Sequence, residues 1–337
     1  MLTLKSHPEN VMIAEIRQGK NKKLTKVFWH PTVKPELRNA VENLDYFFGN
    51  EDFRTRFELS QDQAQNIKEH MSRDQICPEL HSKHFKCKRF ISDALNQEMD
   101  ISDQPNMKFE VNFPPGNNTW GCLELAVGAS SSGKTHHCVE KVRRNLDGPK
   151  ADRRKFLWFS AEWKIDKTVA PLRDLDRYRE DVIGVDCSDG EVEDSQYDSA
   201  LAFYQNEIAS RVEHASPGTI CVFDNPKDFA EGVAPLVRRL VDKMQRVSRH
   251  KNIGLIFVLH SLKSGAWSSQ ANNSCRYFTV FPRSQQAKIR RYLNEEIGLT
   301  LKESRRAVAD FKQHSRALTI RLHSPQCLIS DKMIRLL

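Results

Sequence analysis

The spacing of apolar residues predicts alternating strands and helices over the larger part of the chain. From residue 120 onward, short apolar runs alternate with segments that carry an apolar residue every three or four positions. The predicted strands are 122–127, 155–161, 181–186, 219–223, 253–259 and 277–281, followed by two short ones at 317–322 and 327–329. The predicted helices are 136–146, 199–213, 231–249, 284–297 and 301–313. This alternation predicts an α/β fold with a mostly parallel central sheet flanked by helices.

One of these predicted strands stands out by its hydrophobicity. Residues 253–259 are almost wholly apolar, without the polar alternation of a strand that has one solvent-facing side. Strands buried on both faces have this composition. We therefore expect this strand near the centre of the sheet.

The first hundred residues follow a different pattern. Residues 11–16 and 24–29 are apolar runs separated by a polar, basic turn, which predicts a β-hairpin. Helix-like spacing occurs at 35–48, 60–71 and 78–98, with Ser60 and Asp62 at a helix start. Residues 100–119, rich in Asp, Pro, Asn and Gly, predict a linker. We expect a smaller α+β accessory region at 1–110, whose role the sequence does not indicate, and a larger domain at 111–337.

The composition is that of a soluble globular protein. Of the 337 residues, 39% are hydrophobic and 28% are charged, and no apolar run approaches the roughly 18 residues that cross a bilayer. The N-terminus has no signal-peptide pattern, so we expect an intracellular protein without a membrane span. The eight cysteines are scattered, and Cys122 and Cys221 lie within apolar strands. Reduced core thiols fit this distribution better than disulfides.

The net charge of +8 is concentrated at one end of the chain. Residues 1–115 hold 17 Lys and Arg against 17 Asp and Glu, and residues 116–224 hold 14 against 19. Residues 225–337 hold 21 against 8. A strongly basic segment favours a polyanionic partner, most simply nucleic acid. The alternative is a basic surface that only aids solubility.

A glycine-rich segment carries the most specific chemistry in the sequence. It follows a predicted strand, precedes a predicted helix and fits the pattern G-x-x-x-x-G-K-[ST]; its residues are Gly128, Ala129, Ser130, Ser131, Ser132, Gly133, Lys134 and Thr135. Glycines let backbone N–H groups face phosphates, and the lysine supplies a charge between the β- and γ-phosphates. The Thr135 hydroxyl is a natural Mg²⁺ ligand. We expect ATP at 128–136, where His136 opens the helix, with Lys134 as a catalytic residue.

A second acidic position completes the predicted nucleotide site. The apolar run 220–223 ends in Asp224, at the carboxyl edge of the predicted sheet, where such folds bind ligands. We expect Asp224 and Thr135 to hold Mg²⁺. The next residue, Asn225, stands where many ATPases have a glutamate base, and an amide cannot accept a proton at neutral pH. Glu162, at the end of the strand 155–161, is the preferred base, with Asp228 and Glu231 as fallbacks.

A polar residue also ends the apolar strand 253–259. His260 follows that strand and is predicted to lie near the γ-phosphate, where it would sense hydrolysis. The alternative is a hydrogen-bonded histidine with a structural role only.

Four metal-ligand side chains gather in the N-terminal region. Cys77, His81, His84 and Cys87 have the spacing C-x₃-H-x₂-H-x₂-C, and zinc binds such side chains. On one continuous helix they form a stripe about 15 Å long, which cannot surround a metal tetrahedrally. The preferred interpretation is an ordinary helix, with a zinc site as the alternative.

These features together resemble the FtsK/HerA-type genome-packaging ATPases of double-stranded DNA viruses with jelly-roll capsids. The resemblance covers roughly residues 120–300 and rests on the loop 128–135, the strand ending at Asp224 and the strand tip His260-Ser261. It also rests on a Ser/Asn-rich loop at 268–274, the strand 276–281 and the basic helix after it. The loop and the acidic strand are common to many P-loop enzymes. The first hundred residues have no counterpart in this resemblance.

The resemblance implies a homo-oligomeric ring motor that uses ATP to thread double-stranded DNA into a capsid through a portal-like vertex. In such rings an arginine of one subunit reaches the γ-phosphate bound by its neighbour. Arg276 is the first candidate for this residue, followed by Arg246 and Arg249; each has a plain alternative as a phosphate-backbone contact or surface charge. The implied location is an infected host cell, in the cytoplasm or nucleus, and the virion.

Two other functions stay open from the residues alone. A small-molecule P-loop kinase shares the phosphate loop, although the sequence has no evident arginine-rich lid. A nucleotide-gated assembly protein that binds ATP with little hydrolysis is favoured by Asn225, which leaves the catalytic base unassigned.

Overall fold

The chain forms two compact units in the computed structural model. The described residues are 2–3, 11–18, 23–29, 40–73, 75–95, 98–101, 106–113, 123–188, 197–261, 275–323 and 325–337. The first unit comprises residues 1–109 and 332–337, and the second comprises residues 110–331. The predicted boundary after residue 110 falls beside this division, but the last six residues group with the first unit.

Within the first unit, four strands form a sheet of order β1-β3-β2-β5, and β4 pairs antiparallel with β14. Their bounds are β1 (Leu2–Thr3), β2 (Val11–Gln18), β3 (Lys23–Trp29), β4 (Glu98–Asp100), β5 (Met107–Glu110) and β14 (Met333–Leu336). Strands β2 and β3 pair antiparallel, which confirms the predicted hairpin; its turn at 19–22 lies outside the described residues. Strand β5 lies inside the predicted linker, and β14 follows the two short strands with which the sequence pattern ended.

Helices of the first unit enclose a small core of their own. They are α1 (Ala40–Gly49), α2 (Glu51–Arg56), α3 (Gln61–Ser72) and α4 (His81–Leu95). The predicted start of α3 is confirmed, because the Ser60 hydroxyl accepts from the Gln63 N–H and the Gln63 side chain accepts from the Ser60 N–H. Phe48, Phe53 and Ile67 are buried between these helices.

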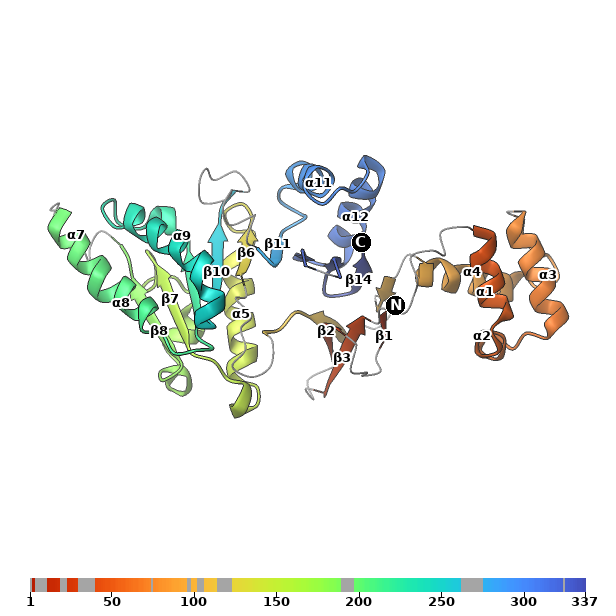
Figure 1. The fold of residues 1–337 in the computed structure, drawn as a ribbon, viewed down its shortest axis with the longest axis horizontal. Helices are drawn as coiled ribbons and strands as arrows, with labels where there is room; N and C mark the ends of the chain where they lie inside the picture. Colours follow the sequence, from red (N-terminus) through yellow and green to blue (C-terminus); the bar gives the residue numbers. More distant parts are fainter. Residues whose placement is uncertain are drawn as a thin grey trace. The chain divides into compact units, whose positions relative to one another are not determined.

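A mostly parallel sheet forms the centre of the second unit, as predicted (Figure 1). Its strand order is β13-β12-β11-β6-β10-β9-β7-β8, and the strands from β11 to β8 are parallel. The bounds are β6 (Leu123–Val127), β7 (Phe156–Ser160), β8 (Val182–Asp186), β9 (Ile220–Asp224), β10 (Gly254–Leu259), β11 (Tyr277–Val280), β12 (Leu318–Arg321) and β13 (Cys327–Ile329). Strand β10 is buried throughout and lies between β6 and β9, which confirms the central position predicted for it.

The longer helices of the second unit occur where the sequence pattern predicts them, and the short α6 was not predicted. Their bounds are α5 (Lys134–Leu146), α6 (Ala170–Arg173), α7 (Tyr197–Phe203), α8 (Ser210–Glu213), α9 (Ala234–Lys251), α11 (Gln286–Glu295) and α12 (Leu301–His314), with short turns at Lys150–Asp152, Asp176–Tyr178 and Pro226–Asp228. A π-helical turn, Tyr204–Ala209, joins α7 to α8, so the predicted helix 199–213 is one element with a widened middle.

Apolar residues on both faces of the sheet hold its strands in place. On one face, Val142 and Leu146 of α5 share a buried cluster with Trp158 of β7. On the other face, Phe159, Phe223 and Phe257 stack across β7, β9 and β10, with ring centroids 5.0 and 5.4 Å apart. This packing fixes the carboxyl ends of the parallel strands at one edge of the sheet.

The described cysteines are buried, and the described helices are short or polar. The seven cysteines in the described ranges are all free and buried, as expected of core thiols. None of the helices that the structure describes is both long enough and apolar enough to cross a membrane.

Candidate functional site

The glycine-rich loop connects the end of β6 to the start of α5, as the sequence predicts. The Gly128 N–H donates to the carbonyl of Leu259 at 3.1 Å, which ties the loop to β10. A Cβ at Gly128 would lie 2.5 Å from Ser132 Oγ and 2.9 Å from a ring carbon of Phe281. Glycine is therefore required at this position for steric reasons.

Two left-handed residues shape the rest of the loop. Ser131 has φ 59° and Gly133 has φ 101°, and α5 begins directly after Gly133. Such a backbone turns successive N–H groups toward one side and forms a concave anion site, to which the N-terminus of α5 adds its dipole. Ser132 Oγ is buried with no hydrogen-bond partner among the described residues. The loop thus offers phosphates a buried hydroxyl at Ser132, whereas Ser130 and His136 are exposed beside it.

Lys134 lies buried at the start of α5, against the loop. Its ammonium donates to the carbonyl of Ala129 at 2.9 Å and lies 3.3 Å from His260 Nδ1. Burial lowers the pKa of this ammonium, and the carboxylate of Asp224 opposes that shift. A buried cation of this kind is the group that a triphosphate requires.

The predicted metal ligands meet at the same edge of the sheet. Thr135 Oγ1 donates to Asp224 Oδ1 at 3.5 Å, although the two residues come from α5 and β9. Asp224 is only 4% exposed. Burial raises the pKa of its carboxyl group to about 7, against the lowering influence of the Thr135 hydroxyl and the Lys134 ammonium.

The Thr135 hydroxyl and the Asp224 carboxylate fit Mg²⁺ better than a metal, such as zinc, that is held by three or four protein side chains. A buried carboxylate beside a hydroxyl provides hard oxygen ligands and lacks full charge compensation. Within the described part of the chain, no group of three or more His, Cys, Asp or Glu is placed to hold a metal. Mg²⁺ in nucleotide sites takes few protein ligands and completes its shell with phosphates and water.

Asn225 occupies a backbone position that explains its identity. It has φ 50° and ψ 58°, in the left-handed region, where asparagine is enriched and most other side chains are strained. Its N–H donates to the Val258 carbonyl at 3.0 Å, and its carbonyl accepts from the Asp228 N–H at 2.8 Å. The residue therefore shapes the turn after β9.

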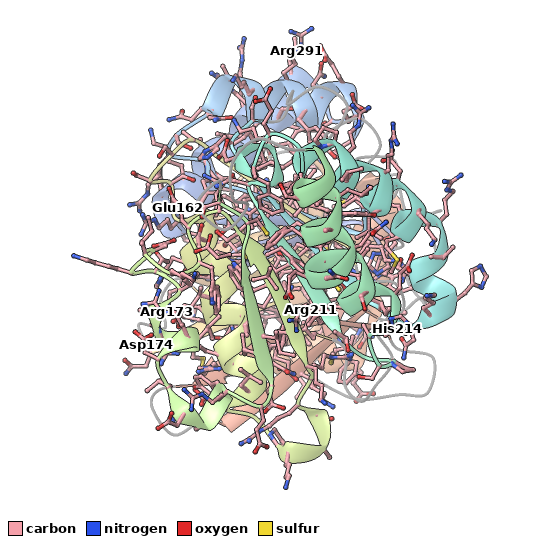
Figure 2. The ribbon with its side chains drawn as sticks, turned by 90° about the vertical axis from the view of Figure 1, so that its left-hand side faces the viewer. Glu162, Arg173, Asp174, Arg211, His214 and Arg291 are labelled. Atoms are coloured by element: carbon pink, nitrogen blue, oxygen red, sulfur yellow. The ribbon has the colours of Figure 1, made fainter. Side chains whose placement is uncertain are left out.

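The end of β7 supplies carboxylates to this edge. Glu162 is exposed, and its N–H donates to Ser160 Oγ at 3.1 Å. Figure 2 shows Glu162 near one end of the sheet, well away from His214, which precedes β9. Asp166 and Glu162 both raise the pKa of Asp224, so both are electrostatic neighbours of this carboxylate. Asp166 is a residue that the sequence reasoning missed, although it lies four positions after Glu162.

A tryptophan anchors the segment that carries these acids. Trp163 packs on Gly184 of β8 so closely that a Cβ there would lie 1.7 Å from the indole ring. Asp166 accepts from the Thr168 N–H at 2.7 Å. The segment after β7 is thus fixed to the sheet.

His260 lies between the loop and the acidic turn, as its position after β10 requires. Because the Lys134 ammonium is a donor, Nδ1 of His260 is the acceptor and Nε2 carries the proton of the neutral ring. Nε2 lies 3.7 Å from the Asp228 carboxylate. Burial, Lys134 and Lys227 lower the pKa of His260. The histidine therefore links the phosphate-loop lysine to the turn after Asp224, while the other fallback base, Glu231, is exposed.

The arginine candidates do not join this site within the chain. Arg276 precedes β11, at the amino edge of the sheet, whereas the loop is at the carboxyl edge. Arg246 is exposed on α9 and donates to the Asp242 carbonyl, and the side chain of Arg249 lies outside the described residues. A role for any of them at a neighbouring subunit stays a prediction.

The N-terminal cysteines and histidines belong to a helical core. Cys77 and Cys87 are buried in the apolar cluster, and Cys77 precedes α4. His84 is also buried, both its ring nitrogens have no partner among the described residues, and burial lowers its pKa. None of these side chains belongs to a group placed to hold a metal within the described ranges. The arrangement provides no support for zinc.

The strand order and the loop together decide the fold class. Strand β10 separates the strand before the phosphate loop from the strand that ends in Asp224, and all three are parallel. The second unit has a P-loop NTPase fold. The predicted fold class is therefore confirmed, and the loop, Asp224 and His260 lie at one edge of the sheet as expected.

Comparisons with solved structures give distant similarities. The genome packaging NTPase B204 of Sulfolobus turreted icosahedral virus 2, in complex with AMPPCP, is 12% identical with a TM-score of 0.37, over 63% of this chain and 98% of that one. The pCW3 conjugation coupling protein TcpA with ATPγS is 11% identical with a TM-score of 0.36, over 63% and 61%. A KaiC-like protein of Pyrococcus horikoshii OT3 is 14% identical with a TM-score of 0.33, over 50% and 74%.

The comparisons therefore place a viral packaging NTPase among proteins similar to this chain. The similarity is too distant to transfer a function. No family model and no curated protein matches the chain.

Proposed function

We propose that this chain hydrolyses Mg-ATP to move double-stranded DNA, as a homo-oligomeric ring that packages a viral genome into a capsid. The observation that carries the proposal is the meeting of Lys134, Thr135 and Asp224 at one edge of the sheet. These groups come from a phosphate loop and a separate acidic strand. Together they are the parts that a P-loop NTPase uses to hold a triphosphate and its metal.

Each residue of this site has a role that follows from its chemistry. The loop N–H groups bind the phosphates, and Lys134 compensates the charge that develops during phosphoryl transfer. Thr135 and Asp224 would hold Mg²⁺, which would neutralise phosphate charge and polarise the reacting phosphoryl group. Glu162 or Asp166 orients the attacking water and accepts its proton. His260, between Lys134 and Asp228, senses the change at the γ-phosphate.

DNA is the proposed polyanionic partner because many basic residues of the last third are exposed. Helices α11 and α12 present the exposed side chains Lys288, Arg291, Lys302, Arg305 and Arg306. In Figure 2, Arg291 lies at the top of the second unit, above Glu162, and its side chain points outward. Contacts of this kind are made to phosphates, so binding would be independent of sequence and sensitive to salt.

The ring and its capsid partner follow from the sequence resemblance. A neighbouring subunit would supply an arginine, with Arg276 as the first candidate, because within the chain Arg276 lies before β11, at the opposite edge of the sheet from the loop. The corresponding location is the infected host cell, in the cytoplasm or nucleus, and the virion.

One observation favours a second function. Asn225 replaces an acidic residue and serves the backbone of its turn, so the site lacks a base directly after Asp224. A protein that binds ATP to assemble, and hydrolyses it slowly, would have such a site.

The deciding experiment is ATP hydrolysis by the purified chain with and without long double-stranded DNA. We expect DNA to stimulate turnover, and the Lys134→Ala variant to lose both basal and stimulated turnover. Micromolar ATP affinity with near-zero turnover would support the assembly function instead. Phosphate transfer to a small acceptor without any effect of DNA would indicate a kinase.

A further inference from the structure

An arginine far along the chain contacts the outer side of the phosphate loop. Arg316 lies in the short segment between α12 and β12, and its side chain is exposed. Its Nε donates to the carbonyl of Ser132 at 3.0 Å, and its Nη2 donates to the carbonyl of Ser131 at 3.4 Å. A Cβ on Gly133 would lie 3.0 Å from Cζ of the same guanidinium, so the arginine lies directly against the loop backbone.

The conformation of the loop explains why its outer side needs such a donor. The left-handed Ser131 and Gly133 turn backbone N–H groups toward the phosphate side. Their neighbouring carbonyls then face away, where they need hydrogen-bond donors of their own. A guanidinium is a planar fork of N–H donors, and it can bridge two adjacent carbonyl oxygens.

The segment that presents Arg316 is itself held in place. The Ser315 N–H donates to the Phe311 carbonyl at 3.0 Å, and its hydroxyl donates to the Ala317 carbonyl at 2.7 Å. Ser315 is 2% exposed. Strand β12, which follows, pairs with β11, and β11 pairs with the strand before the loop. The guanidinium is therefore presented from a fixed position in the same sheet.

We infer that Arg316 is a positioning residue of the nucleotide site, which holds Ser131, Ser132 and Gly133 in their phosphate-binding conformation from the outer side. It touches the loop backbone, so it acts on nucleotide binding through the loop. Its charge also adds to the positive potential of the loop. The inference rests on the proposed ATP site and adds a residue that the sequence motif does not contain.

The test compares Arg316→Ala and Arg316→Lys with wild type, using Mg-ATP and Mg-ADP titrations together with steady-state turnover. We expect Arg316→Ala to weaken both affinities about tenfold, which is about 1.4 kcal/mol, because the loop loses a preorganising contact. The KM for ATP should rise in parallel, while kcat changes less than about threefold. Arg316→Lys should recover part of the affinity, since an ammonium keeps the charge but cannot bridge both carbonyls.

Arg179→Ala is the matched control, because it removes an exposed arginine outside the loop and outside the basic last third. It should bind Mg-ATP as wild type does. Wild-type affinity in Arg316→Ala would overturn the inference, and so would an unchanged affinity in Arg316→Lys if the alanine variant does not fold. Failure of the wild-type protein to bind Mg-ATP would instead overturn the proposed function.

Discussion

The Asp224 carboxyl group differs from a surface carboxylate in its burial and in its pKa. It is buried, and its pKa is raised to about 7 by that burial. A carboxyl group with a raised pKa binds a proton more tightly in the folded chain than in the unfolded one. Its contribution to stability is therefore present below the ordinary pKa of 3.8 and is lost as the pH rises through about 7.

The Asp224→Asn variant should therefore lose turnover and gain stability at alkaline pH without Mg²⁺. We expect an increase of at least about 1 kcal/mol at pH 8, or roughly 2–4 °C in Tm. Between pH 5.5 and 8 its Tm should fall less than that of wild type, and Mg²⁺ should stabilise only the wild type. Thermal unfolding at both pH values measures this. Parallel pH profiles of the two proteins would show that burial of this carboxylate carries no cost.

Glu162 and Asp166 are the competing candidates for the base. Both influence Asp224, and neither is the residue directly after it. Glu162→Gln should abolish hydrolysis and leave ATP binding unchanged, because an amide positions water but accepts no proton. Asp166→Asn is the matched variant and should keep measurable turnover. Normal turnover in Glu162→Gln, with loss in Asp166→Asn, would transfer the role to Asp166.

A buried ion pair joins the strand before the phosphate loop to the helix after it. Glu124 of β6 and Lys141 of α5 form this pair, and both are almost fully buried. Thr279 of β11 donates to Glu124 at 3.1 Å. Burial alone would raise the pKa of Glu124, but the Lys141 ammonium and His137 hold that pKa well below its usual range. The ion pair and the Thr279 hydrogen bond therefore connect β6, α5 and β11.

Lys141→Met should destabilise the chain by about 3–5 kcal/mol, because it leaves the Glu124 carboxylate buried without its partner. The double variant Glu124→Met/Lys141→Met should lose less than the single variant, since no charge stays buried. Chemical denaturation of both variants and wild type measures the difference. A double variant less stable than Lys141→Met would show that the pair itself, rather than the cost of an orphaned charge, stabilises these elements.

At the scale of the molecule, the net charge differs between the middle and the last third of the chain. Residues 225–337 carry 21 basic against 8 acidic residues, and residues 116–224 carry 14 against 19. Some exposed basic side chains of the last third are paired within their helix, such as Arg291 with Glu295 at 2.7 Å. No ion pair is described for Arg305 or Lys302, so these two are the better candidates for phosphate contacts.

Replacing Arg305 and Lys302 with glutamine should weaken DNA binding and flatten its salt dependence. Each lost phosphate contact should reduce the slope of log affinity against log salt by roughly 0.9. Binding of one long duplex between 50 and 200 mM salt measures the slope, with Arg179→Gln as the charge control. An unchanged slope in the double variant would place the DNA surface on other elements.

Local features were predictable because each depends on neighbours in the sequence. The phosphate loop follows from two glycines, one at Gly128 where a Cβ would be crowded and one at Gly133 with a left-handed backbone. The alternation of strands and helices follows from apolar spacing, and the cap at Ser60 follows from its Gln63 partner. Strand β5 was hidden in a polar stretch, because its pairing rather than its composition makes it a strand.

The sequence by itself determined which residues could bind a triphosphate and that a parallel sheet would present them. Only the tertiary structure decided which distant residues serve that loop. Lys134 and His260 are 126 positions apart, and Arg316 lies 184 positions after Ser132. Their contacts depend on the order of strands in the sheet and on the segments between them. The apolar pattern indicated that β10 is central, but it does not say which strands lie next to it, because buried strands share the same pattern.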